Sequence, residues 1–268
     1  MARRRPVDVL RAVAGHPRLM PFTALLLRAR IVRGAPVFCA RELGHRAGAR
    51  TYALRATGMH VVIRHGTGDV VTLGEVFHEQ DYAIPSRVSA ALGVPERILD
   101  LGANIGLFGI FAAERWPRAQ IQAYEPDPAN AAVHRQVIAA NAMQEQWRLV
   151  QAAAGAADGE ARFVSGQVAL SSLDAGGDIA VPVCDVLHAI ADADLVKMDI
   201  EGGEWPILTD PRFAASPPSV IVLEYHPQGC HGPDPHASIA ELLAGAGLQT
   251  IEIWRRDDGY GMLWAWRA

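Results

Sequence analysis

The stretch ILDLGANIGLFG, Ile98–Gly109, is the part of the sequence around which the fold is built. It begins as a short apolar run that contains Asp100, and it then breaks into a turn with Gly102, Asn104 and Gly106. An apolar-periodic segment resumes after the turn. A strand, a glycine turn and a helix start in this order are typical of a cradle for a nucleotide-like ligand, because glycine lets the backbone approach a ligand closely.

Strand-like and helix-like segments alternate after Ile98. The expected strands are Ile121–Tyr124, Arg148–Ala153, Asp194–Ile200, Val220–Tyr225, Leu248–Trp254 and Met262–Trp266, and the expected helices are Pro128–Asn141 and Ala237–Ala246. The last two strands are expected to form an antiparallel pair joined by the turn at residues 257–259. This alternation predicts an α/β, Rossmann-like fold with a mostly parallel sheet and ligands bound at the carboxyl ends of its strands.

Three segments are expected along the chain. Residues 1–50 form a helical extension, with helices at Val7–Ala14 and Phe22–Val32. Residues 51–97 are a lead-in of two strands, Tyr52–Leu54 and His60–Ile63, and a helix at Leu73–Tyr82, which cover the site. Residues 98–268 form the ligand-binding domain.

Composition excludes several classes of protein. Half of the 268 residues are hydrophobic and 20% are charged, which is typical of a globular protein. The net charge of -4 gives no overall field that would favour nucleic acid. The apolar stretch Leu19–Val32 is interrupted by Pro21, Arg28 and Arg30, so we expect no membrane span. The three cysteines form no CxxC pair, and a reduced, cytoplasmic protein is expected.

The glycine turn does not fit a dinucleotide. A dinucleotide fingerprint needs glycine at relative positions 1, 3 and 6, but these positions hold Gly102, Asn104 and Leu107. An NAD-dependent oxidoreductase is therefore disfavoured. Asp100 before the turn suits a cationic ligand without phosphate, such as S-adenosylmethionine (SAM), which carries a sulfonium and an ammonium group. Glu125, at the end of the next strand, is placed to accept hydrogen bonds from ribose hydroxyls.

At this point the chain resembles the FkbM-type methyltransferases over roughly Val61 to Leu248. The motifs that carry the resemblance are GTGDVVTLGEVFHEQDY (Gly66–Tyr82), ILDLGANIG, AYEPDPAN (Ala123–Asn130), LVKMDIEGGEWPIL (Leu195–Leu208) and VIVLEYHP (Val220–Pro227). The resemblance implies a class I methyltransferase fold and SAM-dependent methylation, usually of a hydroxyl on a sugar or secondary metabolite. The cofactor-binding positions expected from it are Tyr82, Asp100, Gly102, Ala103, Asn104, Gly106, Glu125 and Pro126.

Charged side chains gather at the ends of two later strands. Lys197, Asp199 and Glu201 are two residues apart and would share a face if the strand runs that far, and Glu224 and His226 likewise share a face. Because both strands end at the ligand crevice, we expect these five residues to surround the reacting centre.

Methyl transfer to an alcohol requires a group that removes the hydroxyl proton. His226 is the best candidate base, because imidazole titrates nearest to neutral pH. Lys197 would act as a base only if its pKa is depressed, and otherwise pairs with an acid. Glu204 is interpreted as a structural acid at a helix N-terminus.

A divalent metal is a second option, because Asp199, Glu224 and His226 are ligands of the type that bind Mg²⁺ or Mn²⁺. The expected partner is a small-molecule hydroxyl acceptor, and a homo-oligomer is left open. Loop Ser165–Ser172 is one expected wall of the acceptor site. Two alternatives remain: an N-methyltransferase of a small molecule, and a SAM-binding accessory protein without turnover.

Overall fold

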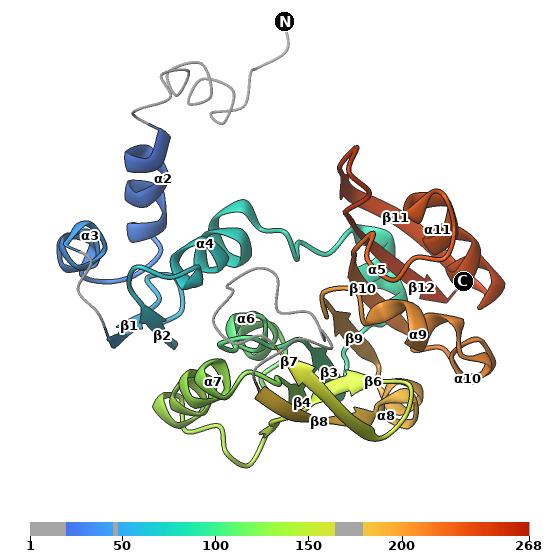
Figure 1. Cartoon of the computed structure of the whole chain (residues 1–268). Coiled ribbons are helices and arrows are strands. Elements are labelled where there is room, and N and C mark those ends of the chain that lie inside the picture. Colours follow the sequence, from blue (N-terminus) through green and yellow to red (C-terminus); the bar gives the residue numbers. More distant parts are fainter. Residues whose placement is uncertain (1–19, 45–47, 164–178, 268) are drawn as a thin grey trace, which may run out of the picture. The chain divides into compact units, whose positions relative to one another are not determined.

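The computed structural model describes residues 20–44, 48–163 and 179–267, and the chain divides into two compact units, Met1–Gln80 and Asp81–Ala268 (Figure 1). The predicted helix Val7–Ala14 and the loop Ser165–Ser172 lie outside the described residues. Within the described ranges, no helix combines the length and the apolar character needed to cross a lipid bilayer.

The described part of the first unit contains helices and a hairpin. Its elements are α2 (Met20–Ala29), α3 (Ala35–Leu43), β1 (Ala49–Ala53), β2 (His60–Arg64), α4 (Asp69–Gly74) and the π-helical turn η1 (Glu75–Glu79). Strands β1 and β2, which correspond to the two strands expected in the lead-in, pair antiparallel. The buried ring of His65 lies between the Tyr52 hydroxyl, 2.7 Å from Nε2, and the Glu42 carboxylate, 2.9 Å from Nδ1. This network joins α3 to the hairpin and gives these polar side chains a structural role.

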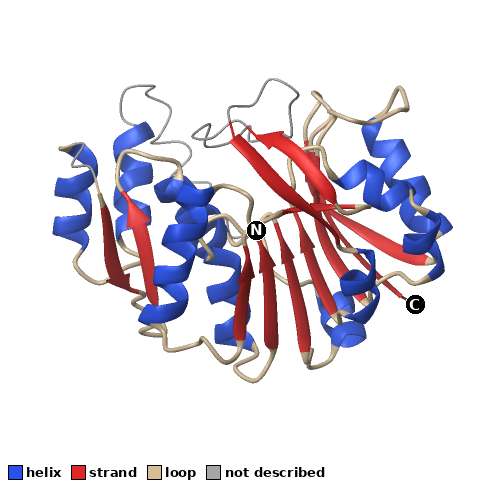
Figure 2. Ribbon diagram, turned by 60° about the horizontal axis from the view of Figure 1, so that its bottom comes forward, coloured by secondary structure: helices blue, strands red, loops and turns tan. Residues whose placement is uncertain are grey.

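The second unit is built on a seven-stranded sheet (Figure 2). Its strands, in spatial order, are β11 (Leu248–Arg255), β12 (Gly261–Arg267), β10 (Val220–Tyr225), β9 (Leu195–Met198), β3 (Arg97–Leu101), β4 (Gln120–Tyr124) and β5 (Trp147–Val150). Strand β12 is antiparallel to both of its neighbours, and the other pairs are parallel. The predicted Rossmann-like fold with a C-terminal antiparallel pair is confirmed.

Helices pack on both faces of this sheet. On one face, Leu99, Val196 and their alternate neighbours form a hydrophobic core with α8 (Leu187–Asp192), α9 (Glu204–Thr209) and α11 (Pro235–Gly245). Trp147 lies on the other face, where α6 (Leu107–Arg115) and α7 (Pro128–Ala140) pack beside it. Helix α5 (Ser86–Leu92) contacts β10 and β12, and α10 (Pro211–Ala215) follows α9.

A second, three-stranded sheet lies between β5 and α8 in the sequence. It consists of β6 (Ala153–Gly155), β8 (Ile179–Asp185) and β7 (Gly159–Phe163), in that spatial order. The sequence predicted one strand over Arg148–Ala153, but the chain leaves the large sheet after Val150, and Ala153 begins the small one. Hydrophobicity alone does not distinguish these two sheets, because both segments are apolar and short.

Register between the strands determines which side chains meet. Asp100 on β3 is opposite Lys197 on β9, and Lys197 is opposite Val222 on β10. Because side chains alternate along a strand, Glu224 lies on the same face as Lys197 and Asp100. The carboxyl ends of β3, β9 and β10 therefore bring three charged residues to one face of the sheet.

Candidate functional site

The glycine turn after β3 requires backbone conformations that suit glycine. Gly102, Asn104 and Gly106 have positive φ angles of 75°, 47° and 87°. A Cβ atom at Gly102 would lie 1.7 Å from the backbone oxygen of Asp199, and one at Gly106 would lie 2.7 Å from the ring of His134. The turn is therefore packed so closely against two other elements that larger residues at these two positions would displace it.

Glu125 holds the turn from the end of β4. Its carboxylate accepts hydrogen bonds from the backbone N–H of Asn104 at 2.7 Å and of Asp127 at 2.9 Å. Burial raises the pKa of Glu125 to about 7, although these hydrogen bonds act in the opposite direction. Ala103 donates its N–H to the Tyr124 oxygen at 2.9 Å, and Pro126 follows Glu125 directly.

His134 on α7 is a contact of the turn that the sequence did not reveal. Its Nδ1 donates to the backbone oxygen of Asn104 at 3.2 Å, and its ring packs edge-on against Trp147. Burial lowers the pKa of His134 to about 4, so the imidazole is neutral. Asn104 is thus held by Glu125 at its N–H and by His134 at its carbonyl, which stabilises its left-handed conformation. The apolar pattern of the predicted helix Pro128–Asn141 gives no indication that His134 has this role.

Asp100 and Lys197 form a buried pair beneath the turn. The Asp100 carboxylate is completely buried and accepts no hydrogen bond from any residue that the structure describes. Burial raises the pKa of Asp100 to about 6, and the Lys197 ammonium, 3.7 Å away, opposes this effect. Lys197 donates to the Gly102 oxygen at 2.6 Å and to the Leu101 oxygen at 3.3 Å.

The sequence left two roles open for Lys197, a base with a depressed pKa or an ion-pair partner of an acid, and the direction of its pKa shift distinguishes them. Burial lowers this pKa, but the carboxylates of Asp199 and Asp100 outweigh burial, so that the pKa of Lys197 is raised overall. A depressed pKa was the condition for Lys197 to act as a base. The geometry therefore favours the alternative of an ion pair, in which Lys197 remains protonated and supports the turn.

The turn has features that fit SAM. The Asp100 carboxylate beneath it accepts no hydrogen bond in the described structure, and the Glu125 carboxylate lies against the turn, so both acids stand where they were expected from the sequence to meet the cofactor. Tyr82, 8% exposed, packs with its ring centroid 5.0 Å from that of Phe108 on α6, the helix that begins at the turn. The predicted cofactor residues thus lie together, and their individual roles stay predictions.

The second group of predicted residues, Asp199, Glu201, Glu224 and His226, forms what we call the acid–histidine cluster. His226 Nε2 lies 3.3 Å from Glu201 Oε2 and 4.0 Å from Asp199 Oδ1, and Glu224 lies close enough to share a ligand with Asp199 and His226. Asp199 Oδ2 lies 3.5 Å from the ammonium of Lys197. The five residues predicted to surround the reacting centre are therefore brought together.

The sequence suggested that alternation along one strand would bring Asp199 and Glu201 to the same face, if the strand ran that far. The structure brings them together in another way. Strand β9 ends at Met198, so Asp199 and Glu201 lie in the following turn. Glu201 has a φ of +55°, and Gly202 has a φ of +98° with Gln228 packed against it. A tight turn, rather than a continued strand, directs the two carboxylates towards His226.

Glu204 was interpreted as a structural acid, and the structure places it inside the site. Its side chain is fully buried, and Oε1 accepts from the backbone N–H of His226 at 2.6 Å and lies 3.0 Å from His226 Nδ1. Its other oxygen accepts from the Gly202 N–H at 2.9 Å. Because a carboxylate only accepts, Nδ1 carries the proton, and Nε2 is the nitrogen directed towards Asp199 and Glu201.

Negative charge dominates the cluster. Burial lowers the pKa of His226, but the hydrogen bond and charge of Glu204 and the charge of Asp199 outweigh it and raise the pKa to about 9. Burial and the charge of Asp199 raise the pKa of Glu201 to about 7 and that of Glu224 to about 8. The cluster therefore retains protons near neutral pH, with His226 as an imidazolium.

Tyr260, in the turn between β11 and β12, is a neighbour that no sequence signal had indicated. Its ring packs edge-on against the ring of His226, with 5.4 Å between centroids. Its hydroxyl accepts a hydrogen bond from Gln228 at 2.9 Å. The hairpin turn thus contacts the acid–histidine cluster, although the hydrophobic pattern of the sequence predicted only a connection there.

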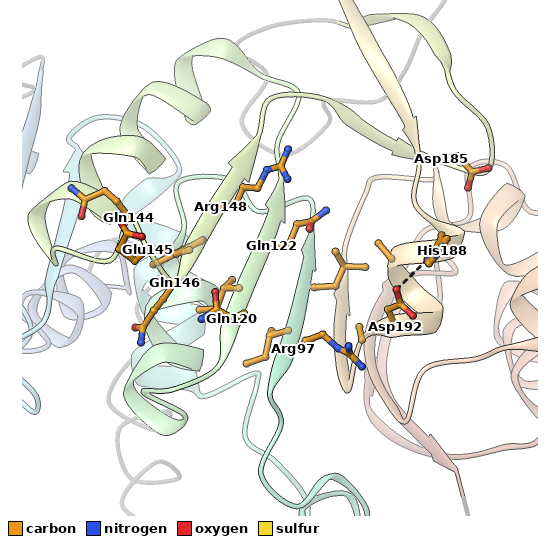
Figure 3. Close-up of a pocket in the computed structure, with 16 residues that line it drawn as sticks. Arg97, Gln120, Gln122, Gln144, Glu145, Gln146, Arg148, Asp185, His188 and Asp192 are labelled. Carbon is orange, nitrogen blue, oxygen red and sulfur yellow. Dashed lines mark ion pairs between the residues drawn. The ribbon is translucent and has the colours of Figure 1, made fainter.

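A pocket of about 530 Å³ lies elsewhere on the second unit (Figure 3). Its lining includes the first residues of three strands, Arg97, Gln120 and Trp147, and the exposed ion pair His188–Asp192 on α8. None of the residues in the glycine turn or the acid–histidine cluster is among its lining residues. We locate the candidate site at the opposite, carboxyl ends of the strands, because the charged groups with shifted pKa values lie there.

The chain was compared with known proteins. It matches the model of the "Methyltransferase FkbM domain" over residues 100–249, and no curated protein sequence matches it significantly. Similar solved structures include precorrin-6y C5,15-methyltransferase from Geobacter metallireducens, with 17% identity, a TM-score of 0.41, and coverage of 69% of this chain and 94% of that chain. An O-methyltransferase family protein from Burkholderia thailandensis is 13% identical, with a TM-score of 0.43 and coverage of 75% and 57%, respectively. TYW2 of M. jannaschii in complex with AdoMet is 14% identical, with a TM-score of 0.45 and coverage of 82% and 85%.

The family match spans more than half of the chain and contains both parts of the site. It begins at Asp100, before the glycine turn, and extends past the acid–histidine cluster to residue 249. The resemblance noted in the sequence is therefore confirmed. The chain belongs to the FkbM methyltransferase family and is a SAM-dependent methyltransferase.

Proposed function

We propose that this methyltransferase transfers the methyl group of SAM to a hydroxyl of a small molecule, a sugar or a secondary metabolite. The observation that carries the proposal is the acid–histidine cluster beside the glycine turn. Lys197 links the two, since its ammonium lies 2.6 Å from the Gly102 oxygen and 3.5 Å from Asp199. An acceptor bound against the cluster would thus lie next to the cofactor turn.

The charge of the cluster supports an oxygen acceptor over a nitrogen acceptor. A hydroxyl must lose its proton as it attacks the methyl group, and ionised carboxylates such as those of the cluster accept protons. An amine would instead be held as an ammonium ion by the same negative charge, and an ammonium ion has no lone pair with which to attack. The site therefore assists an alcohol and hinders an amine.

The reaction is an in-line displacement. The acceptor oxygen forms a bond to the methyl carbon while the bond from that carbon to sulfur breaks, and S-adenosylhomocysteine (SAH) leaves. The hydroxyl proton passes to the acid–histidine cluster. Positive charge on the sulfonium is dispersed in this step, so alignment of the two reactants supplies a large part of the acceleration.

The proposal is tested with methyl-labelled SAM and a panel of glycosides, hydroxylated metabolites and amines. We expect label on hydroxyl compounds, and we expect Asp199→Asn to lower kcat/KM by about 100-fold or more. Asp192→Asn, which removes an exposed acid on α8, is the matched control and should retain activity. Label on amines alone, or equal activity of the two variants, would contradict the proposal. Tight SAH binding without transfer to any acceptor would favour the accessory-protein alternative.

A further inference from the structure

Three donor atoms at the carboxyl ends of β9 and β10 are arranged as a metal site. Asp199, Glu224 and His226 each offer one ligand atom, and these atoms lie within 4.8 Å of one another. Opposite ligands of an ion with bonds of about 2.1 Å lie about 4.2 Å apart. A shift of a few tenths of an ångström in each of these side chains is enough to close the three atoms around one ion.

We propose that Asp199, Glu224 and His226 bind one divalent cation of the Mn²⁺ type. This inference rests on the proposed function, since the bound ion would lower the pKa of a coordinated acceptor hydroxyl. Asp199 is 28% exposed, so an ion can enter from solvent.

The orientation of His226 supports this assignment. Its ring is 4% exposed, and the fully buried Glu204 binds both its backbone N–H and Nδ1. Nε2 is therefore left facing the carboxylate ligand Asp199, whose Oδ1 lies 4.0 Å away. Histidines that bind metals commonly donate their second ring N–H to a carboxylate in this way, which fixes the ring and makes the ligating nitrogen more basic.

The distribution of charge also supports a cation. Lys197 faces the glycine turn, where it donates to two backbone oxygens, and it meets Asp199 only at Oδ2. Asp199 Oδ1 is directed instead towards His226. Glu201, Glu204 and Glu224 add three further carboxylates around this imidazole. A divalent ion bound here would offset the charge of these carboxylates, because uncompensated buried charges are costly.

The ligand set favours one class of ion. Mg²⁺ prefers oxygen ligands, whereas a set of two carboxylates and one imidazole also suits Mn²⁺ and related transition metals. Three protein ligands leave positions for water and for an acceptor hydroxyl. Glu201 is not in the ligand set, and its carboxylate lies beside His226 Nε2, so it is the group left to receive the hydroxyl proton.

The test is direct binding of Mn²⁺ to the full chain after treatment with EDTA and gel filtration. Calorimetry and electron paramagnetic resonance should show one Mn²⁺ per chain, and Asp199→Asn and His226→Gln should each weaken binding at least 10-fold. Glu204→Gln should weaken it about 10- to 100-fold, as expected for a residue that orients a ligand. His188→Gln and Asp192→Asn change the exposed pair on α8 and should leave Mn²⁺ affinity unchanged.

Two measurements separate this inference from the proposed function. Each variant is first shown to be folded by its thermal unfolding and by its SAH affinity. Absence of Mn²⁺ binding in a folded, SAH-binding protein, or binding that both ligand variants retain, would overturn the metal site. Methylation of a hydroxyl in EDTA would likewise overturn it and leave the proposed function standing. Specific Mn²⁺ binding in an enzyme that methylates only amines would refute the proposed function and leave the metal site standing.

Discussion

Replacing Gly102 by alanine would test how closely the glycine turn packs on Asp199 of the acid–histidine cluster. The new methyl group would lie 1.7 Å from the backbone oxygen of Asp199, at a residue whose φ is +75°. Two costs therefore add. The left-handed conformation costs alanine about 1–2 kcal/mol. Relief of the clash by displacing backbone costs about a further 1–3 kcal/mol, as in overpacked cores.

The matched control is Gly247→Ala. Gly247 has almost the same φ, +76°, but no described atom lies within 4 Å of a Cβ built there. This variant carries only the conformational cost, about 1–2 kcal/mol. In a unit of this size, 1 kcal/mol corresponds to about 2–4 °C in Tm. We therefore expect Tm to fall by about 5–15 °C for Gly102→Ala and by about 2–8 °C for Gly247→Ala.

Thermal unfolding and calorimetric titration with SAH measure the two effects. Gly102→Ala should also weaken SAH binding at least about 10-fold, since each 1.4 kcal/mol changes affinity tenfold. Gly247→Ala should bind SAH as the parent protein does. Equal losses of Tm together with unchanged SAH affinity in Gly102→Ala would refute the close packing of the glycine turn against Asp199.

Three further predictions concern the same unit. Glu125→Gln should weaken SAH binding about 10- to 100-fold, because an amide has only one acceptor oxygen for the two backbone N–H groups that the carboxylate now binds. The control is Glu160→Gln at an exposed position. Equal SAH affinities of the two variants would contradict the role of Glu125. Burial raises the pKa of Asp100 to about 6, so its contribution to stability is present below about pH 4 and is lost as the pH rises to about 6. Between these pH values, the Tm of the unliganded Asp100→Asn variant should therefore fall less steeply with pH than the Tm of the parent protein. Identical slopes of Tm against pH in the two proteins would contradict this prediction. Gly109→Ala gains about 1 kcal/mol of helix propensity, but its Cβ would lie 1.8 Å from the Trp147 ring, so we expect Tm to fall and not to rise.

Much of the second unit could be predicted from local sequence. Apolar runs bounded by turn residues indicated the strands of the large sheet, and the residues at the glycine turn disfavoured a dinucleotide site. These signals are local: a strand's burial and a turn's glycine requirement depend on neighbouring residues. Helices α5, α8 and α10 were not predicted, because each has seven residues or fewer and shows less than two turns of periodicity.

The sequence by itself determined the family, the cofactor turn and which charged residues stand at strand ends. Only the tertiary structure decided which hydrogen bonds and ion pairs these charged residues form and how their pKa values shift. Glu204 and His134 look like ordinary helix residues, yet one orients His226 and the other holds the carbonyl of Asn104. The physical reason is that hydrogen bonds and pKa values depend on distance and burial. The distances and the burial are set only when β9, β10 and the turn after β3 come together in the fold. The spacing of residues along the chain does not predict them.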